Sequence, residues 1–297
     1  MRHDLDHHEG QRVSRRRLIA GVGSIGLAGL LAACGRDGGT VTTSTGETVS
    51  PQATASTSAD LAALFGAANT CTLTASTTQG PYYFDADKIR SDIREDRAGT
   101  RLRVAIRVQD SEQCGPLADA VVEIWHCDAA GLYSGAEAQS SGASGGGAPS
   151  GGTPPSDAPG GNPPGGGAAP GGGAEGAAAD LTPTDDKRYL RGAQVTNADG
   201  IVEFTTVWPG WYRGRTTHIH AMVHVGDDRV LTTQMMFDET LNSRVYAAAP
   251  YAAHTGRDTF NDNDSIYAET MLTKVVEDGD GYLSVINFSV DADRDGT

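Results

Sequence analysis

Apolar and polar residues alternate in several short stretches of the chain, which is the pattern of strands that bury one face. The clearest case runs from Leu102 to Val108, where every second residue is large and apolar and two arginines lie between them. Residues 120–124 repeat the pattern after a Cys-Gly-Pro turn. The same period predicts further strands at 201–207, 217–225, 230–237 and 282–290.

Only one stretch has helical spacing. Leu61, Leu64 and Phe65 form one stripe between residues 58 and 68, which predicts a short helix. Short strands separated by turn signals favour a mainly β fold, an antiparallel β-sandwich, for one domain at residues 61–297.

A Gly/Pro/Ala/Ser-rich tract at residues 135–180 interrupts this domain. It has almost no large apolar side chain and cannot bury enough surface to offset the entropy of ordering, so it is interpreted as a disordered insertion. A linker between two domains is the alternative. It is disfavoured because the residues after Tyr189 carry only half of the chemistry described below.

The first 33 residues resemble an export signal. Arg15, Arg16 and Arg17 precede a weakly apolar run that is too short for a membrane-spanning helix, as in a twin-arginine signal peptide. The run ends in Leu-Ala-Ala-Cys34, which is similar to a lipoprotein cleavage site, so we expect a lipid on Cys34, with plain cleavage as the alternative. The Thr/Ser/Gly-rich residues 34–60 would then be a flexible tether from the outer face of the cell membrane. Without the lipid, the protein would be secreted.

Charge and cysteine content narrow the possible partners and sites. The formal net charge is −15, and without residues 1–33 it is −17, which argues against nucleic acid. If Cys34 is acylated, three cysteines remain, namely Cys71, Cys114 and Cys127, and the sequence does not decide which two could pair. No two cysteines have the spacing of a zinc site.

The predicted strand at 217–225 carries His218 and His220 on one face. Residues two apart on a strand lie about 6.6–7 Å apart along it, so both imidazoles can reach one metal ion. His224 shares that face but lies too far along the strand, and we expect it to be structural.

Three aromatic blocks accompany the histidines. Trp208-Pro209-Gly210-Trp211-Tyr212-Arg213-Gly214-Arg215 leads into their strand, Ile124-Trp125-His126 continues to Tyr133 just beyond another strand, and Thr78-Gln79-Gly80-Pro81-Tyr82-Tyr83 opens the domain. Together with His218-Ile219-His220, these blocks resemble the intradiol ring-cleavage dioxygenases of the catechol and protocatechuate type.

That resemblance implies a prealbumin-like catalytic β-sandwich and Fe(III)-dependent cleavage of a catechol-type ring by O2 to a muconate-type diacid. It assigns four metal ligands, Tyr133, Tyr212, His218 and His220. It also implies that Tyr212 acts as a base for a substrate proton, that Arg215 stabilises negative charge on the substrate, and that Gln234 is an active-site residue.

The proposed ligands are consistent with that metal. Phenolate and imidazole without thiolate suit a hard, oxidised iron, and the absence of a carboxylate argues against a two-histidine, one-carboxylate Fe(II) site. Two alternatives remain open at this stage: a non-catalytic β-sandwich binding module at the cell surface, and a zinc hydrolase in which Asp128 or Asp238 completes the histidine pair.

Overall fold

A computed structural model describes residues 41–42, 48–49, 59–68, 71–141, 180–226 and 228–294 of the chain. The predicted signal peptide at 1–33, the lipid site at Cys34 and most of the tether at 34–60 lie outside these residues. Within the tether, β1 (Val41–Thr42) pairs with β2 (Thr48–Val49) in an antiparallel ladder. No helix in the described part of the chain is long and apolar enough to cross a membrane.

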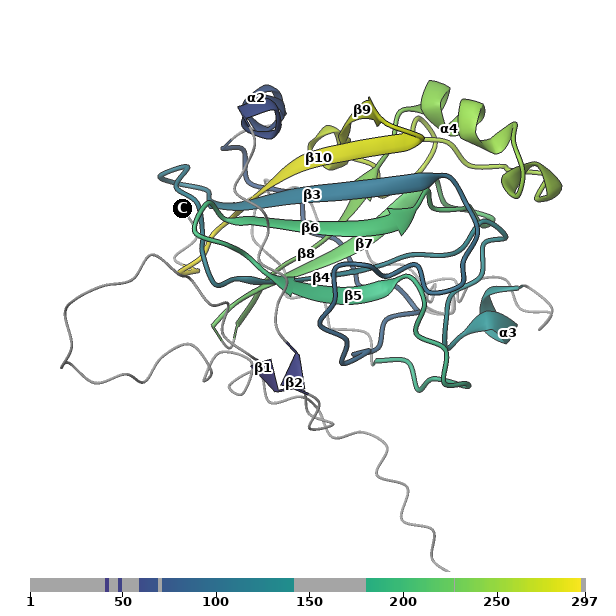
Figure 1. Ribbon diagram of the computed structural model, residues 1–297, viewed down its shortest axis with the longest axis horizontal. Helices are drawn as coiled ribbons and strands as arrows, with labels where there is room; N and C mark the ends of the chain where they lie inside the picture. Colours follow the sequence, from purple (N-terminus) through teal and green to yellow (C-terminus); the bar gives the residue numbers. More distant parts are fainter. Residues whose placement is uncertain are drawn as a thin grey trace, which may run out of the picture.

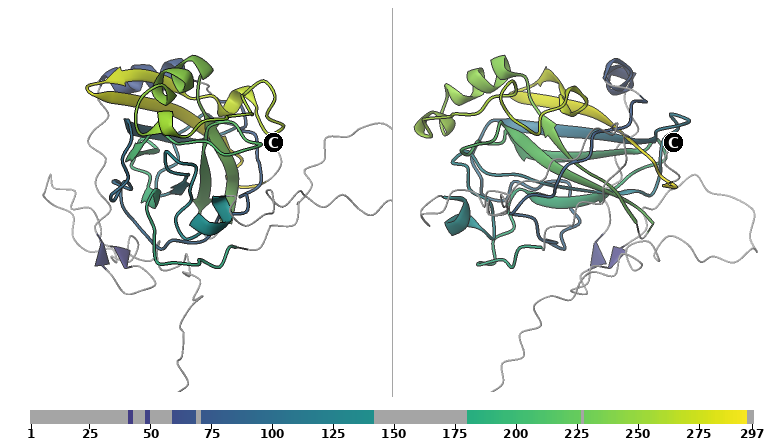
Figure 2. Two further views of the ribbon diagram at one scale, coloured as in Figure 1. Left: turned by 90° about the vertical axis from the view of Figure 1, so that its right-hand side faces the viewer. Right: turned by 180° about the vertical axis from the view of Figure 1, so that it is seen from behind.

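Two four-stranded sheets pack face to face, as the alternating pattern predicts (Figures 1 and 2). The first sheet has the order β6-β3-β10-β9, and the second has the order β5-β4-β7-β8. The strands of the first sheet are β3 (Arg101–Asp110), β6 (Ile201–Val207), β9 (Lys274–Asp278) and β10 (Gly281–Val290). Those of the second are β4 (Val121–Trp125), β5 (Arg191–Val195), β7 (His218–Val225) and β8 (Asp228–Met236).

The mainly β sandwich is confirmed, with one exception to its antiparallel pairing. β10 pairs with β3 in parallel over nine residues, from Tyr282 opposite Leu102 to Val290 opposite Asp110. Two strands of the sandwich, β5 and β9, were not predicted. β5 has the sequence Arg-Gly-Ala-Gln-Val and β9 the sequence Lys-Val-Val-Glu-Asp, and neither alternates large apolar with polar residues. Their partners in the sheets, rather than their own patterns, make them strands.

The main core lies between the two sheets, where Val104 and Ile106 of β3 meet Val122 and Ile124 of β4. The predicted helix is α2 (Ala59–Ala67), whose Leu61 and Phe65 pack with Ala105 and Val285 in a second apolar cluster. The remaining helical segments are α3 (Glu137–Ser140), α4 (Glu239–Tyr246), η1 (Tyr251–Ala253) and η2 (Glu269–Met271).

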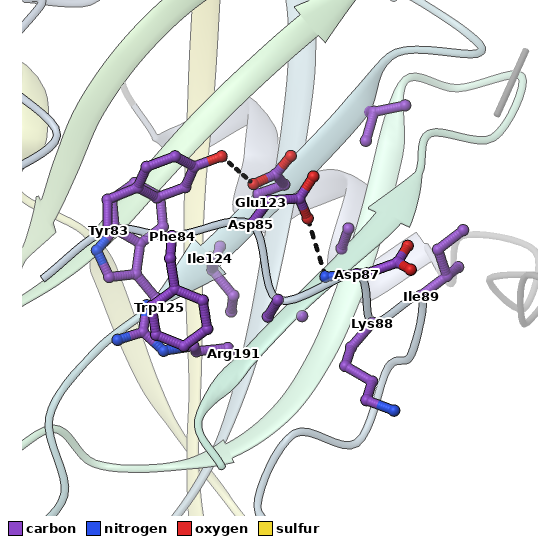
Figure 3. Close-up of a pocket in the computed structure, with 14 residues that line it drawn as sticks. Tyr83, Phe84, Asp85, Asp87, Lys88, Ile89, Glu123, Ile124, Trp125 and Arg191 are labelled. Atoms are coloured by element: carbon purple, nitrogen blue, oxygen red, sulfur yellow. Dashed lines mark hydrogen bonds between the residues drawn. The ribbon is translucent and has the colours of Figure 1, made fainter. Parts of the chain in front are cut away.

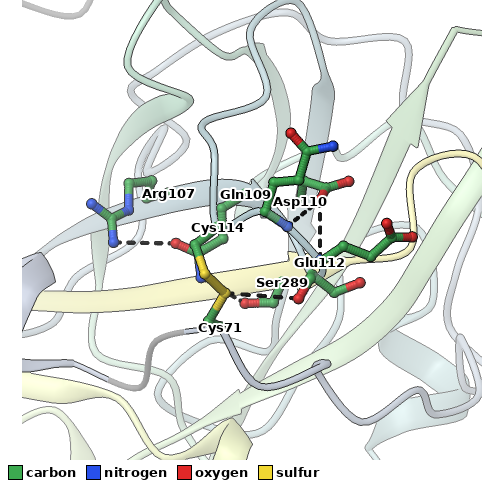
Figure 4. Close-up of a disulfide and its surroundings, with 9 residues drawn as sticks. Cys71, Arg107, Gln109, Asp110, Glu112, Cys114 and Ser289 are labelled. Atoms are coloured by element: carbon green, nitrogen blue, oxygen red, sulfur yellow. Dashed lines mark hydrogen bonds between the residues drawn. A yellow bond between two sulfur atoms is a disulfide. The ribbon is translucent and has the colours of Figure 1, made fainter. Parts of the chain in front are cut away.

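A disulfide joins Cys71 to Cys114, a pairing that the sequence left open (Figure 4). It ties the segment that enters the domain to the turn that follows β3. Cys127 remains as a buried free thiol.

The disordered insertion was predicted at residues 135–180, and this start is too early. Residues 135–141 are part of the fold, because Ala136 is fully buried and residues 137–140 form α3. The Glu137 carboxylate accepts hydrogen bonds from Tyr189 at 2.7 Å and Lys187 at 2.5 Å. Composition missed this turn because its small residues are held by contacts with distant side chains. The remainder of the insertion, residues 142–179, lies outside the described residues.

Candidate metal centre

The two histidines of β7 lie on the outer face of the second sheet, away from the main core. Ile219, Ala221 and Val223 point into the core between the sheets, so the strand alternation turns His218 and His220 the other way. Both histidines are nevertheless 1 % exposed. Loops therefore cover this face, and those loops bring the aromatic residues.

A tight turn after β4 delivers Tyr133. The Asp128 carboxylate accepts hydrogen bonds from the Ala130 and Leu132 backbone N–H groups at 2.9 and 3.0 Å, which closes the turn. The Tyr133 N–H in turn donates to the Ser140 hydroxyl at 3.0 Å. The position of Tyr133 thus depends on α3, inside the segment that the sequence analysis took for disordered.

The loop that carries Tyr212 packs tightly against this turn, and two glycines allow the contact. A Cβ on Gly210 would lie 2.1 Å from the Asp128 carbonyl oxygen, and one on Gly131 would lie 2.5 Å from that of Trp211. Gly131 also has a φ of +82°, which L side chains rarely adopt. Only glycine at both positions lets the two tyrosine-bearing loops meet.

Two other predicted ligand atoms lie close to His218 Nε2. The Nε2 atoms of His218 and His220 are 3.1 Å apart, and the Tyr212 hydroxyl is 3.2 Å from His218 Nε2. Two ligand atoms about 2.1 Å from a shared ion, at right angles, would be about 3.0 Å apart. His218 Nδ1 donates to the Thr216 carbonyl oxygen at 2.6 Å, so its Nε2 is free to offer a lone pair.

Tyr133 closes the fourth side of this cluster. Its ring centroid lies 5.8 Å from that of Tyr212 and 6.3 Å from that of His220. Its hydroxyl is buried and makes no hydrogen bond of good geometry within the described residues. Burial raises the pKa of Tyr133 well above its ordinary value, and the neighbouring Tyr212 adds to this rise. A buried, unpaired hydroxyl is costly unless a partner such as a metal ion satisfies it.

Burial also keeps both histidines neutral. It lowers the pKa of His218 to about 3, with a further contribution from Arg215, and lowers that of His220 well below its ordinary value. Neutral imidazole is the form that binds metals. The four residues therefore fit a metal ion in donor type, and the buried Tyr133 hydroxyl, which has no hydrogen bond of good geometry among the described residues, is consistent with one.

Arg215 and Gln234 lie together beside the cluster. Gln234 pairs with His220 across the β7–β8 ladder, so the two side chains share a face. An Arg215 N–H donates to the Gln234 carbonyl oxygen, and Arg215 Nε donates to the Asp264 carboxylate at 2.9 Å. The Gln234 amide N–H group is buried without a hydrogen-bond partner in the described part of the molecule. It is thus an unused donor next to the ligands.

Four contributors to the site escaped the sequence analysis. Trp125 stacks on His220 with a ring separation of 4.9 Å, and Tyr82 stacks on Tyr133 at 4.7 Å. Gly80 allows the covering loop to approach, because a Cβ there would lie 3.1 Å from His220 Cε1. Arg191 lies beside Trp125 in the β4–β5 ladder and is 2 % exposed. Trp125, Tyr82 and Gly80 belong to the aromatic blocks, but nothing in the sequence indicated Arg191, since β5 has no pattern of its own.

Figure 3 shows a neighbouring pocket, where Tyr83 lies near Trp125. The Tyr83 hydroxyl donates to the Glu123 carboxylate at 3.0 Å. The same carboxylate lies 3.6 Å from His224, which is 1 % exposed. His224 therefore has the structural role that its place on the strand predicted.

The zinc hydrolase alternative has no support in the geometry. Asp238 caps the N-terminus of α4, and Asp128 holds the turn before Tyr133 and lies 3.4 Å from Arg97. Within the described ranges, no carboxylate or thiolate joins His218 and His220 at ligand spacing.

The fold is similar to that of solved dioxygenase structures, including an intradiol ring-cleavage dioxygenase. No family model and no curated protein sequence matches the chain. Among solved structures, an intradiol ring-cleavage dioxygenase from Tetranychus urticae is 29 % identical with a TM-score of 0.59, covering 75 % of this chain and 96 % of that one. A second structure, described as a dioxygenase, is 28 % identical with a TM-score of 0.60, covering 75 % of this chain and 95 % of that one. The resemblance inferred from the motifs is thereby confirmed.

Proposed function

We propose that this chain is an Fe(III)-dependent dioxygenase that opens catechol-type rings between the two hydroxyl-bearing carbons, consuming O2 and releasing a muconate-type diacid. The observation that carries the proposal is that the Tyr212 hydroxyl and His220 Nε2 both lie within 3.2 Å of His218 Nε2, beside a Tyr133 hydroxyl that has no hydrogen bond of good geometry among the described residues. Two phenolates favour the ferric state of iron. Iron held there would draw electron density from a bound catechol and so make the ring reactive towards O2.

Tyr212 is the ligand best placed to take a proton from the substrate. It is part-buried at the surface of the cluster, whereas Tyr133, His218 and His220 are fully enclosed. Because Tyr212 lies in a loop and not in the sheet, its side chain could move without rearranging the sheet. As a free phenolate, Tyr212 would accept the second catechol proton, a general-base role.

Arg215 and Gln234 would act on the charge that develops on the substrate. The Asp264 carboxylate holds the Arg215 guanidinium in place, so no reorganisation is needed when negative charge appears. The unpaired Gln234 amide offers a hydrogen bond on the same side. Together they place fixed hydrogen-bond donors beside the ligands.

Export completes the proposal. The paired arginines, the weak apolar run and Cys34 support twin-arginine export and a lipid anchor at the outer face of the cell membrane. Export of an already folded protein suits an enzyme that loads its metal before leaving the cytoplasm. Mass spectrometry of the mature N-terminus tests this part, because an acylated Cys34 is expected and an uncut N-terminus would contradict it.

Metal analysis of the purified protein, with oxygen uptake, is the decisive experiment. We expect close to one iron per chain, a visible tyrosinate-to-iron charge-transfer band, and ring opening of catechol, hydroxyquinol or protocatechuate. A colourless protein that stays inactive after reconstitution with iron would favour the non-catalytic binding module. Iron and colour without oxygen uptake would retain the metal site but exclude these simple catechols.

A further inference from the structure

Arg191 is a buried cation without a carboxylate partner in the described part of the chain. Its side chain is among the largest that are fully buried, and it forms no ion pair there. Arg215, by contrast, has Asp264 at 2.9 Å. Burying an uncompensated charge costs several kcal/mol, so a site that retains such a charge needs a counter-charge from another source.

The guanidinium instead holds the two segments that place the stacked tyrosines. Its Nη2 donates to the Tyr82 carbonyl oxygen at 2.8 Å and to the Ser134 carbonyl oxygen at 2.9 Å. Its Nε donates to the Ser134 hydroxyl at 2.9 Å. Ser134 follows Tyr133 directly, so one side chain links the segments that carry Tyr133 and Tyr82.

The surroundings of Arg191 suggest which group balances its charge. The guanidinium carbon lies 4.0 Å from the ring centroid of Phe84, which is beside it in Figure 3. It lies 6.0 Å from the ring centroid of Tyr133. Its Nη1 is buried and unpaired within the described residues. Tyr133 is the adjacent side chain that becomes anionic when it binds a metal ion, and low polarity strengthens their attraction.

We propose that Arg191 is a positioning residue of the metal centre. Its guanidinium donors hold the segments of Tyr133 and Tyr82 in place, and its buried positive charge balances the negative charge of Tyr133 as a metal ligand. The inference rests on the proposed function, because the negative charge on Tyr133 arises from metal binding. Arg191 acts through Tyr133 and is not expected to touch the substrate.

Two substitutions separate the effect of the paired guanidinium donors from the effect of the positive charge. Arg191→Met removes both, and Arg191→Lys keeps the charge but loses the paired donors. Arg188→Met is a matched control, since Arg188 lies 4.8 Å from the same Phe84 ring but is partly exposed. Each variant is made in the full chain, loaded with iron, and measured for iron affinity, visible spectrum and near-ultraviolet circular dichroism.

For Arg191→Met we expect iron binding about 10- to 100-fold weaker, the usual effect of losing a group that orients a ligand. The charge-transfer band should move to longer wavelength, because losing the positive charge raises the energy of the tyrosinate electrons. The double variant Tyr212→Phe/Arg191→Met should show the same shift relative to Tyr212→Phe alone. Tyr133 is the remaining tyrosinate in both proteins. Arg191→Lys should bind iron more weakly but keep the wild-type band, and Arg188→Met should change neither quantity.

An Arg191→Met variant with the wild-type band would show that the charge does not act on Tyr133, and would overturn the proposal. If that variant does not fold, Arg191→Lys decides, because wild-type iron affinity in it would refute the positioning role. Wild-type protein that is colourless and free of iron would instead refute the proposed function. The Arg191 variants are interpreted only when wild type binds iron, so the two failures are distinguishable.

Discussion

The two faces of β7 differ completely although their residues alternate along one strand. Ile219, Ala221 and Val223 pack in the main core, while His218 and His220 face a cluster of aromatic side chains from loops. All five are buried to at least 99 %. Burial alone therefore does not distinguish core from site. The distinction is that the inner face packs against the opposite sheet. Around the outer face, the Tyr133 hydroxyl and the Gln234 amide nitrogen have no hydrogen-bond partner among the described residues.

The strongest test of this contrast replaces neighbouring residues on opposite faces. His220→Ala should lose most of its iron and all measurable turnover, with little loss of stability in the metal-free protein. Ile219→Ala should cost about 2–5 kcal/mol of unfolding free energy, while the folded fraction still binds iron. Iron analysis and denaturant unfolding of both variants measure this. Normal iron content in His220→Ala would remove it from the ligand set.

Tyr212→Phe tests the most exposed ligand on the outer face. Three protein ligands remain, so part of the iron should stay bound, but loss of the proposed base should lower turnover by about 10²–10⁴-fold. Oxygen uptake per bound iron is the measurement. Wild-type turnover in Tyr212→Phe would assign the proton transfer to another group.

Arg215→Ala tests whether Arg215 stabilises the negative charge that develops on the substrate. Iron and colour should persist, because Arg215 is not a ligand, and turnover should fall by about 10²–10³-fold. Arg213→Ala is the matched control, since Arg213 lies two residues away and is exposed. Equal rates for wild type and Arg215→Ala on every accepted catechol would contradict the assigned role.

The pH dependence of stability should reveal the contribution of the ionised Asp264 carboxylate, which pairs with Arg215. Although burial opposes it, hydrogen bonding from the Thr216 N–H and the charge of Arg215 lower the pKa of Asp264. A carboxyl whose pKa is lower in the folded state stabilises the protein above its unfolded pKa of about 3.9. That contribution is lost as the pH falls through the folded value.

The melting temperature of Asp264→Asn should thus lie below that of wild type at neutral pH, and the gap should narrow below about pH 4. Thermal unfolding of the metal-free proteins between neutral and acidic pH measures it. A gap that stays constant over this range would show that the ionised carboxylate contributes nothing.

The smallest effect is expected from the insertion. Removing residues 142–179 should change stability by about 1 kcal/mol or less, because loop closure depends only weakly on length. Removing residues 136–179 should cost more and disturb Tyr133, since it deletes buried Ala136 and the Ser140 hydroxyl that accepts from the Tyr133 N–H. Comparing iron content and melting temperature of both deletions tests this. Equal behaviour would show that α3 does not support the site.

Local pattern in the sequence predicted most of the scaffold. Alternation located the six predicted strands, including the one that carries His218 and His220, because a strand with one buried face must repeat every two residues. The motifs identified all four candidate ligands, and the structure brings them together. The spacing of His224 also separated it correctly from the pair.

Tertiary structure decided whatever depends on residues that are distant in the chain. The parallel pairing of β10 with β3, the edge strands β5 and β9, and the Cys71–Cys114 bridge leave no periodic trace, because their partners lie elsewhere in the sequence. The same holds for α3 and for Arg191. A glycine-rich turn becomes ordered only through Tyr189 and Lys187, and a lone arginine acquires its place only once the segments of Tyr82 and Ser134 fold around it. The sequence alone supplied the tyrosines and histidines that can bind a metal ion. Packing between distant segments decided that the Tyr133 hydroxyl is buried without a hydrogen-bond partner among the described residues.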